Sequence, residues 1–327
     1  MSRPSLLIVG GGLVGRALAW RMAAHHDVAL VTDGQAAASS AAAGMLAPAF
    51  EALHDRAVPA LHALLEDSLA YWDVFAHDLM AASDQNIDYR RNGIIGIDFP
   101  PGALPGAVDI PLPEGIRGTQ AVCLGHEGQV DPRRVLTALT IACERAGVAS
   151  HIGQVDALVT EGGVCRGVSL DDGTPMLADR VVIATGARAA LVPHLQALMV
   201  PVRGRAYRIA LPDHGLDHVI RTGSIYLCPK ADGSLYLGAT EETADGEDNR
   251  LDDLWQAGCE LFPALVDGQV TAIFDGQRPG IRGGEPRIGR DGDVENLYVG
   301  LGLDRNGVLL TPIVTDRLVR LLTEDQF

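Results

Sequence analysis

The chain contains a glycine turn whose spacing suits the binding of a diphosphate. An apolar run at residues 6–9 ends in Gly10-Gly11-Gly12-Leu13-Val14-Gly15, and residues 16–24 have the composition of a helix. Gly10 permits a tight turn, Gly12 lets a diphosphate approach the backbone, and Gly15 lets helix and strand pack closely. The amino end of the helix then faces the negative charge. The pattern predicts a dinucleotide site, with an ordinary glycine-rich turn as the alternative.

A carboxylate follows the second predicted strand, residues 28–31. Asp33 lies about where an acidic side chain holds the adenosine ribose of a dinucleotide. A shift of one residue in this strand would place Thr32 there and Asp33 beyond it. The sequence therefore leaves both residues open as the ribose ligand.

The composition is that of a soluble protein with enough residues for two interleaved domains. The 327 residues carry a net charge of −16, and 47% of them are hydrophobic. Such a field repels phosphates, so we expect no binding to nucleic acid or to an anionic membrane. No stretch approaches the roughly 20 apolar residues of a membrane span. Because few residues precede the first strand, we also expect no signal peptide and a cytoplasmic protein.

The five cysteines are scattered along the chain and form no C-x-x-C pair. This pattern favours neither a disulfide framework nor a zinc site. We therefore expect the cysteines to fill the core, and we expect no metal.

Alternating strands and helices predict a nucleotide-binding α/β domain that is interrupted by a second domain. Asp131 and Pro132 predict the start of a helix, as its N-cap and its first residue. Residues 179–187 form a continuous apolar strand of the kind that is buried in a parallel sheet. Residues 199–273 have the strand pattern of an antiparallel sheet. We expect the first domain at 1–85, 125–200 and 275–327, and the second at 86–124 and 201–274.

Several further segments together span nearly the whole chain. They are Ser40-Ala41-Ala42-Ala43-Gly44-Met45-Leu46, Ala184-Thr185-Gly186-Ala187, Ile225-Tyr226-Leu227-Cys228-Pro229, Leu237-Gly238-Ala239-Thr240, Arg278-Pro279-Gly280, Pro286-Arg287-Ile288-Gly289 and Asp304-Arg305-Asn306-Gly307-Val308-Leu309-Leu310-Thr311-Pro312. With the glycine turn, and in this order, they resemble the D-amino acid oxidase superfamily of FAD enzymes. The resemblance is closest to the glycine oxidases of thiamine biosynthesis.

The resemblance implies a Rossmann-type FAD-binding domain and an interleaved α+β substrate domain whose antiparallel sheet lies over the flavin ring. FAD is expected to be non-covalent, because the 36–47 turn has no histidine and no cysteine stands beside Arg278. The residues implied to contact FAD are Gly10, Gly12, Leu13, Val14, Gly15, Asp33, Ser40, Ala43, Gly44, Met45, Val155, Thr185, Gly186, Arg305, Asn306, Gly307, Val308 and Leu309.

The resemblance also implies residues that hold the substrate. In glycine oxidases the arginine of the R-P-G motif binds the substrate carboxylate, which carries over to Arg278. A guanidinium offers two parallel donors that fit a carboxylate, although an ion pair with Asp275 or Glu285 is the structural alternative. The tyrosine of the Y-x-x-P strand carries over to Tyr226. Its hydroxyl would reach the same carboxylate, unless the ring only packs in the strand.

The Arg305-Asn306-Gly307 turn passes under the pyrimidine edge of the flavin in this family, where backbone N–H groups stabilise negative charge. Arg305 is also implied at the substrate; a common turn in which Asp304 pairs with Arg305 is the alternative. The sequence departs from the glycine oxidase pattern nearby. Gly302-Leu303-Asp304 replaces a segment that usually contains histidine, and Ile281 replaces the threonine after R-P-G. These departures affect the choice of substrate and leave FAD binding intact.

The leading hypothesis is the oxidation of glycine or a small D-amino acid to its imine, by hydride transfer to flavin N5 with reduction of oxygen to hydrogen peroxide. One alternative is a secondary amine of the sarcosine or proline type as substrate. Another is a flavoprotein subunit that passes electrons to a partner, and a nicotinamide dehydrogenase is a third. The sequence leaves open the oligomeric state, a homo-oligomer included, and the use of the imine in thiamine synthesis.

Overall fold

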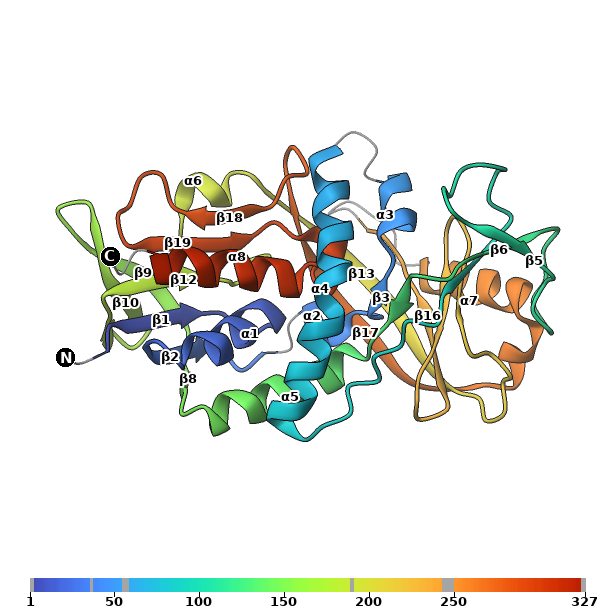
Figure 1. Ribbon diagram of the computed structural model, residues 1–327, viewed down its shortest axis with the longest axis horizontal. Coiled ribbons are helices and arrows are strands. Elements are labelled where there is room, and N and C mark those ends of the chain that lie inside the picture. The colour runs from blue at the N-terminus through green and yellow to red at the C-terminus, as the bar shows by residue number, and fades with distance from the viewer. Residues whose placement is uncertain (1–2, 36–37, 55–58, 189–190, 243–249, 325–327) are drawn as a thin grey trace.

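The computed structural model describes residues 3–35, 38–54, 59–188, 191–242 and 250–324. These residues form two parts that lie side by side along the long axis of the molecule (Figure 1), and each part is built on one large sheet. Among the described helices, none combines the length and the apolarity needed to cross a lipid bilayer.

The first part has a six-stranded sheet that is parallel except at one edge. Its order is β18 (Arg287–Arg290), β19 (Leu297–Leu301), β12 (Arg180–Ile183), β1 (Ser5–Val9), β2 (Asp27–Thr32) and β8 (Ala149–Ile152), and β18 is the antiparallel strand. Residues at or just after the carboxyl ends of the five parallel strands line a single cavity. This is the edge at which open α/β sheets bind ligands.

The central strands are covered on both faces, which explains their continuous apolar sequence. Leu6 and Ile8 pack against a layer of helices, whereas Leu7 and Val9 pack on the opposite face against Val168 of a small second sheet. The helices are α1 (Leu13–Met22), α4 (Pro59–Ser83), α5 (Pro132–Arg145) and α8 (Thr311–Glu324), and the small sheet contains β9 (Val155–Glu161), β10 (Val164–Leu170) and β11 (Pro175–Leu177). The short helix α6 (Pro193–Gln196) also packs on this second face.

The ends of two helices test the sequence predictions directly. The predicted start of α5 is confirmed, because the Asp131 side chain accepts a hydrogen bond from Arg133 N at 3.0 Å and Pro132 is the first helical residue. Helix α1 begins at Leu13, three residues earlier than predicted. Gly12 is extended and serves as its N-cap, so the amino end of the helix lies within the glycine motif itself.

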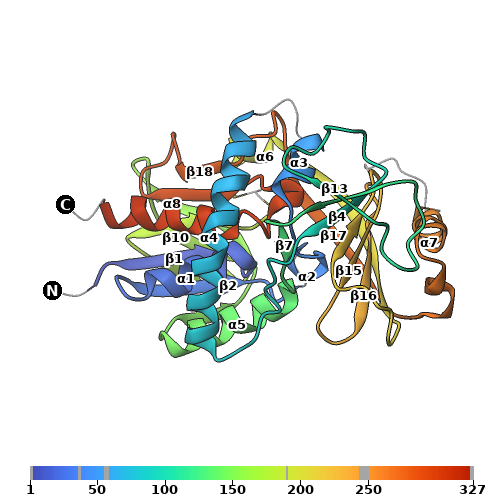
Figure 2. The ribbon, with the colours of Figure 1, turned by 45° about the vertical axis from the view of Figure 1, so that its right-hand side comes forward.

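The second part is an eight-stranded sheet with a helix packed on one face (Figure 2). Its order is β17 (Gln269–Ile281), β13 (Met199–Ala210), β16 (Ser234–Gly238), β15 (Tyr226–Pro229), β14 (Val219–Arg221), β4 (Ile94–Ile97), β6 (Ala121–Leu124) and β5 (Val108–Ile110). Helix α7 (Arg250–Leu261) and the 3₁₀ turn η1 (Pro263–Asp267) bury Leu254, Leu261 and Leu265 against this sheet.

The second sheet is antiparallel, as predicted, except where β4 and β14 pair in parallel. These two strands come from the separate segments 86–124 and 201–274, so no hairpin fixes their relative direction. The remaining short elements are α2 (Ala38–Ala41), β3 (Met45–Leu46), α3 (Pro48–His54), β7 (Gly128–Gln129) and η2 (Asp304–Asn306). Figure 1 places α2, β3 and α3 between the two parts.

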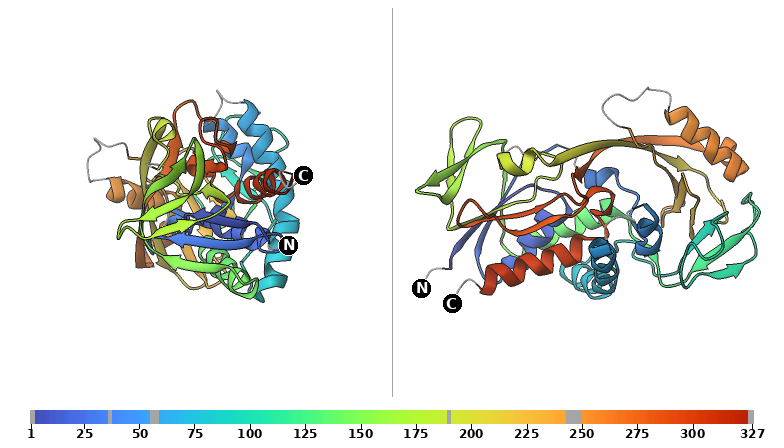
Figure 3. Two further views of the ribbon diagram at one scale, coloured as in Figure 1. Left: turned by 90° about the vertical axis from the view of Figure 1, so that its left-hand side faces the viewer. Right: turned by 90° about the horizontal axis from the view of Figure 1, so that it is seen from above.

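Two long strands connect the two parts. β13 and β17 pair along their whole length, from Met199 opposite Ile281 to Ala210 opposite Gln269, and run from beside the first part into the second sheet (Figure 3). Both strands continue without a break through residues 200 and 275, where we expect domain boundaries. The residues on these strands are therefore fixed relative to both sheets.

Candidate active site

A cavity lies where the two parts meet, at the carboxyl edge of the first sheet. Its volume is about 1130 Å³, which exceeds the roughly 300–1,000 Å³ of a pocket for one drug-sized ligand. Gly15 and Ser40 lie outside its lining. The predicted site residues that line it are Gly10, Gly12, Leu13, Val14, Asp33, Ala43, Gly44, Met45, Val155, Thr185, Gly186, Tyr226, Arg278, Arg305, Asn306, Gly307, Val308 and Leu309.

The glycine turn forms one wall of the cavity, and its geometry excludes larger residues. Gly10 has a φ of +119°, and a Cβ on it would lie 2.3 Å from the Ala184 carbonyl oxygen. A Cβ on Gly15 would lie 1.9 Å from the Gly10 carbonyl oxygen, so Gly15 supports the turn from behind. Gly12 caps α1 without a side-chain hydrogen bond, although Leu13 N, the first N–H of the helix, donates to Ser39 Oγ at 3.3 Å. The amino end of α1 therefore presents backbone N–H groups beside the cavity, as a diphosphate requires.

Thr32 and Asp33 both line the cavity but have different partners. Thr32 Oγ1 accepts a hydrogen bond from Gly34 N at 3.3 Å. The Asp33 carboxylate accepts one from Gln35 N at 3.0 Å and is paired with Arg188, which also lines the cavity. Both side chains line the cavity, so both stay predicted ligands of the ribose.

The turn before β3 is held in place from the second part. Lys230, the only lysine in the sequence, follows β15 and is 4% exposed. Its Nζ donates to Ala43 O at 2.6 Å, to Gln129 Oε1 at 3.1 Å and to Val130 O at 3.2 Å. Burial lowers the pKa of Lys230. The next residue of the turn, Gly44, has a φ of +85° and lies too close to Val130 O for any Cβ.

Two further predicted segments offer polar groups to a ligand. Thr185 Oγ1 is buried and has no hydrogen-bond partner among the described residues. The segment 305–309 leads into α8, and its backbone is fixed at Leu309, whose carbonyl accepts hydrogen bonds from Ser68 Oγ at 2.6 Å and Trp72 Nε1 at 2.9 Å. A fixed backbone at this point can present its own polar groups to a bound molecule.

Arg278 lines the cavity and has no carboxylate partner in the part of the chain that the structure describes. Its guanidinium donates to Thr240 O at 3.1 Å and to Arg203 O at 3.4 Å. Asp275 is paired instead with Arg203, and no carboxylate of the described residues lies within ion-pair distance of Arg278. The structural alternative for Arg278, a salt bridge with Asp275 or Glu285, is thus not formed. Gly204 makes room for the guanidinium, because a Cβ on it would lie 2.4 Å from Arg278 Nη2.

Tyr226 lies near Arg278 and is only partly exposed. Its ring stacks on that of Tyr236, with 6.3 Å between the ring centroids, and Gly238 on the neighbouring strand leaves space for it. Burial raises the pKa of Tyr226, while the positive charge of Arg278 acts in the opposite direction. The phenol is therefore a neutral hydrogen-bond donor close to the arginine.

Three charged residues at the same end of the cavity have no counterpart in our sequence predictions. Arg221 Nη1 donates to Glu51 Oε1 at 2.9 Å. Arg305 Nη2 lies 2.8 Å from Glu241 Oε2, and Arg305 Nε lies 3.8 Å from Glu51 Oε2 and 4.0 Å from Asp304 Oδ2. Glu241 directly follows the Leu237-Gly238-Ala239-Thr240 motif, which was a signal for it. No comparable signal marks Glu51 or Arg221.

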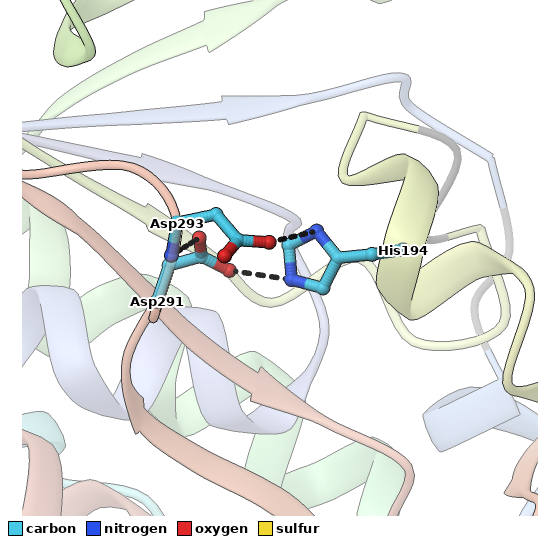
Figure 4. Close-up of side chains that lie close together, drawn as sticks. All are labelled: His194, Asp291 and Asp293. Atoms are coloured by element: carbon cyan, nitrogen blue, oxygen red, sulfur yellow. Dashed lines mark hydrogen bonds and ion pairs between the residues drawn. The ribbon is translucent and has the colours of Figure 1, made fainter.

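A cluster outside the cavity has metal-binding residue types but the geometry of an ion pair. His194 lies between Asp291 and Asp293 (Figure 4), with Nε2 3.0 Å from Asp291 Oδ2 and Nδ1 3.5 Å from Asp293 Oδ2. One nitrogen or oxygen atom from each of the three side chains lies within 4.8 Å of the others, and each ring nitrogen of His194 faces a carboxylate. The two contacts connect α6 to the loop between β18 and β19.

Comparison with known proteins identifies the family. The model of the FAD dependent oxidoreductase (DAO) family matches residues 5–321, so the chain belongs to this family. It is 30% identical to the bifunctional protein ThiO/ThiG of Synechocystis sp. over 357 residues, which cover 98% of this chain and 52% of that protein. It is 27% identical to the glycine oxidase of Pseudomonas putida, with 97% and 94% covered. The chain spans about half the length of its bifunctional relatives.

Solved structures confirm the predicted fold class. The glycine oxidase of Bacillus cereus superimposes with a TM-score of 0.88 at 22% identity, over 99% of this chain and 98% of that one. The iminodiacetate oxidase of Chelativorans sp. superimposes with a TM-score of 0.87 at 22% identity, over 98% and 95%. The chain therefore has the α/β fold of these proteins, a Rossmann-type domain with an interleaved α+β part.

The cavity fits the FAD that the family requires. Its size suits a dinucleotide together with a small second molecule, and the lining at Gly10, Gly11 and Gly12 carries no side chain that would keep a diphosphate from the backbone. Thr185 Oγ1, which is buried and has no hydrogen-bond partner among the described residues, would be available to a bound cofactor. The charges of Arg278, Arg221 and Glu51, which also line the cavity, act on Tyr226.

Proposed function

We propose that this protein oxidises a small amino acid, glycine or a D-amino acid, to its imine with FAD as the electron acceptor and oxygen as the oxidant. The observation that carries the proposal is Arg278, a guanidinium that lines the cavity, lies near a neutral tyrosine and has no carboxylate partner among the described residues. A carboxylate of the substrate would complete this arrangement.

The residues of the chain act mainly by binding and orientation. Arg278 would bind the two carboxylate oxygens, and the Tyr226 hydroxyl would donate to one of them. This fixes the direction of the Cα–H bond, and such orientation contributes a large share of the rate in this kind of reaction. FAD supplies the acceptor for the hydride when it is bound. The backbone of 305–309, which lines the cavity, and the amino end of α8 would stabilise negative charge on its ring.

Non-covalent FAD is part of the proposal. The lining of the cavity, as far as the structure describes it, contains neither histidine nor cysteine, the side chains expected for a covalent flavin link. We also propose a cytoplasmic location and a small amine as the natural ligand. Whether copies of the chain associate is a separate question, which sedimentation would answer.

The test is spectroscopic. The purified protein should be yellow, and denaturation should release free FAD. Glycine, sarcosine, proline and D-amino acids would then be added one at a time without oxygen, and at least one small amino acid should bleach the flavin. Hydrogen peroxide should form when air is admitted. If no amine bleaches the flavin, the proposed activity is wrong; bleaching by sarcosine or proline alone would point to a secondary-amine enzyme.

A further inference from the structure

Glu51 is a buried carboxylate at the substrate end of the cavity, and within the described part of the chain only one of its oxygens has a hydrogen-bond donor. The residue is 7% exposed and lines the cavity from the first turn of α3. Oε1 accepts a hydrogen bond from Arg221 Nη1 at 2.9 Å. Oε2 accepts none from the described residues; Arg305 Nε lies 3.8 Å away, beyond hydrogen-bond distance. A buried acceptor of this kind is unfavourable until a donor reaches it.

The surroundings of Glu51 indicate which donor would fit. Arg221 already uses Oε1, and Arg305 is held by Glu241 at 2.8 Å. Arg278, which has no carboxylate partner among the described residues, lines the cavity together with Tyr226. The charges of Arg278, Arg221 and Glu51 all act on the Tyr226 phenol. This end of the cavity therefore presents a cation for a carboxylate and, within reach of the same tyrosine, an anion for an amine. An amino acid carries both groups.

We propose that Glu51 Oε2 accepts a hydrogen bond from the amino group of the substrate and so makes the site selective for amino acids over plain carboxylates. This proposal rests on the proposed function and adds to it. The pair with Arg221 fixes the rotamer of Glu51, and α3 fixes its backbone, so the acceptor is oriented before the substrate arrives. Arg278 and Glu51 together would define the orientation of the substrate by its two charged groups.

The experiment separates binding of the amine from binding of the carboxylate. The best substrate from the bleaching panel provides the first quantity, its dissociation constant from anaerobic reduction of the flavin. The matching acid without the amine, acetate for glycine or propionate for D-alanine, provides the second, its inhibition constant. In Glu51→Gln we expect the dissociation constant of the amino acid to rise roughly tenfold or more, since a charge-assisted hydrogen bond is lost. The inhibition constant of the plain acid should stay the same or fall, since the variant removes a negative charge that repels the acid.

Glu127→Gln is the matched control. Glu127 is fully buried, and its Oε1 accepts a hydrogen bond at 2.7 Å from Ala49 N of α3, the helix that carries Glu51. Glu127 itself does not line the cavity. This variant should leave both constants unchanged. If Glu51→Gln raises both constants alike, or neither, the role of Glu51 is overturned even though the wild-type enzyme oxidises amino acids. If the wild type is not bleached at all, it is the proposed function that fails.

A second variant covers the case in which Glu51→Gln does not retain its flavin. Glu51→Asp keeps the charge but shortens the side chain, so the carboxylate moves away from the amine. The dissociation constant of the amino acid should rise by a smaller factor, while the inhibition constant of the plain acid stays unchanged. Equal changes in both constants would again contradict the proposal.

Discussion

The two ends of the cavity are built by different means. At the glycine turn, the wall is backbone, and its shape depends on places where a Cβ cannot fit, as at Gly10 and Gly15. At the other end, the wall consists of charged side chains from distant segments, among them Glu51, Arg221 and Arg278. A backbone wall recognises a shape common to many cofactors, whereas paired side chains can be adjusted one at a time. Under the proposed function, cofactor binding and the choice of substrate thus depend on different residues.

The largest expected effect is at the glycine turn. In Gly15→Ala the new Cβ would lie 1.9 Å from the Gly10 carbonyl oxygen, and both are backbone, so α1 must move away from β1. We expect FAD binding to weaken by more than about 3 kcal/mol, which is over a hundredfold. The flavin content of the purified protein and its dissociation constant would measure this. Gly292→Ala, where no atom lies within 4 Å of the new Cβ, is the control; a Gly15→Ala protein that keeps its full flavin would contradict the account.

Arg278→Ala should have the next largest effect, and on the substrate alone. Loss of a charge-assisted pair at a partly buried site should weaken the binding of carboxylate substrates by about 2–3 kcal/mol, which raises their KM roughly 30- to 150-fold. The flavin content of the variant should be normal. Arg203→Ala is the control, since Arg203 is paired with Asp275 and does not line the cavity. Steady-state kinetics would decide; a KM that changes equally in both variants would remove Arg278 from substrate binding.

The same contrast explains what the sequence could predict. Backbone demands leave fixed spacings, so the glycine turn, the Asp131-Pro132 helix start and the apolar strand into Ile183 were predictable from local rules. The length of β13 and β17 was not, because their pairing joins residues about 60 to 80 positions apart. The parallel pairing of β4 with β14 could not be predicted either, because it also joins residues that are far apart in the sequence.

Among the site residues, too, those in local sequence motifs were predictable, whereas those brought together only by folding were not. Arg278 and Tyr226 stand within recognisable motifs, and the structure places both at the cavity. Glu51 stands in the first turn of a helix, where an acidic residue is common because it interacts favourably with the helix dipole. Its contact with Arg221, 170 residues further along, exists only in the folded chain. Sequence rules for one helix cannot anticipate such a pair.

Lys230 lies in the second part of the molecule and holds the turn before β3, which lines the cavity. We expect its replacement to have a smaller effect on ligand binding than the changes at Gly15 and Arg278. Its ammonium offers three donors to three oxygens, and one of these belongs to the turn that lines the cavity. Lys230→Met would leave these oxygens without a donor, at a cost of about 2 kcal/mol, lowering Tm by a few degrees and weakening FAD binding. Lys230→Arg should not restore either property, because a planar guanidinium cannot match a compact site. Thermal unfolding with and without FAD would test this; full rescue by arginine would show that charge alone matters.

The smallest effect on ligand binding is expected at Glu127, which contributes to neither wall. Burial raises its pKa to about 8, from an ordinary 4.5. Between these values the folded chain keeps a proton that the unfolded chain releases, so stability is highest at the acid end and falls as pH rises. Glu127→Gln removes this dependence. The free energy of unfolding of wild type minus variant should decrease by up to about 1.4 kcal/mol per pH unit between pH 5 and 8.

Urea unfolding of wild type and Glu127→Gln at pH 5, 6, 7 and 8 would measure this difference. Glu144→Gln, a change at an exposed position of α5, should keep the wild-type slope. Parallel curves for wild type and Glu127→Gln would show that Glu127 is ionised in the folded protein across this range. Its charge would then act on the Glu51 and Arg221 pair, because the three groups interact. Glu127→Gln would in that case also change amino acid binding. Residues behind the lining of the cavity would then influence the substrate as well as the residues that line it.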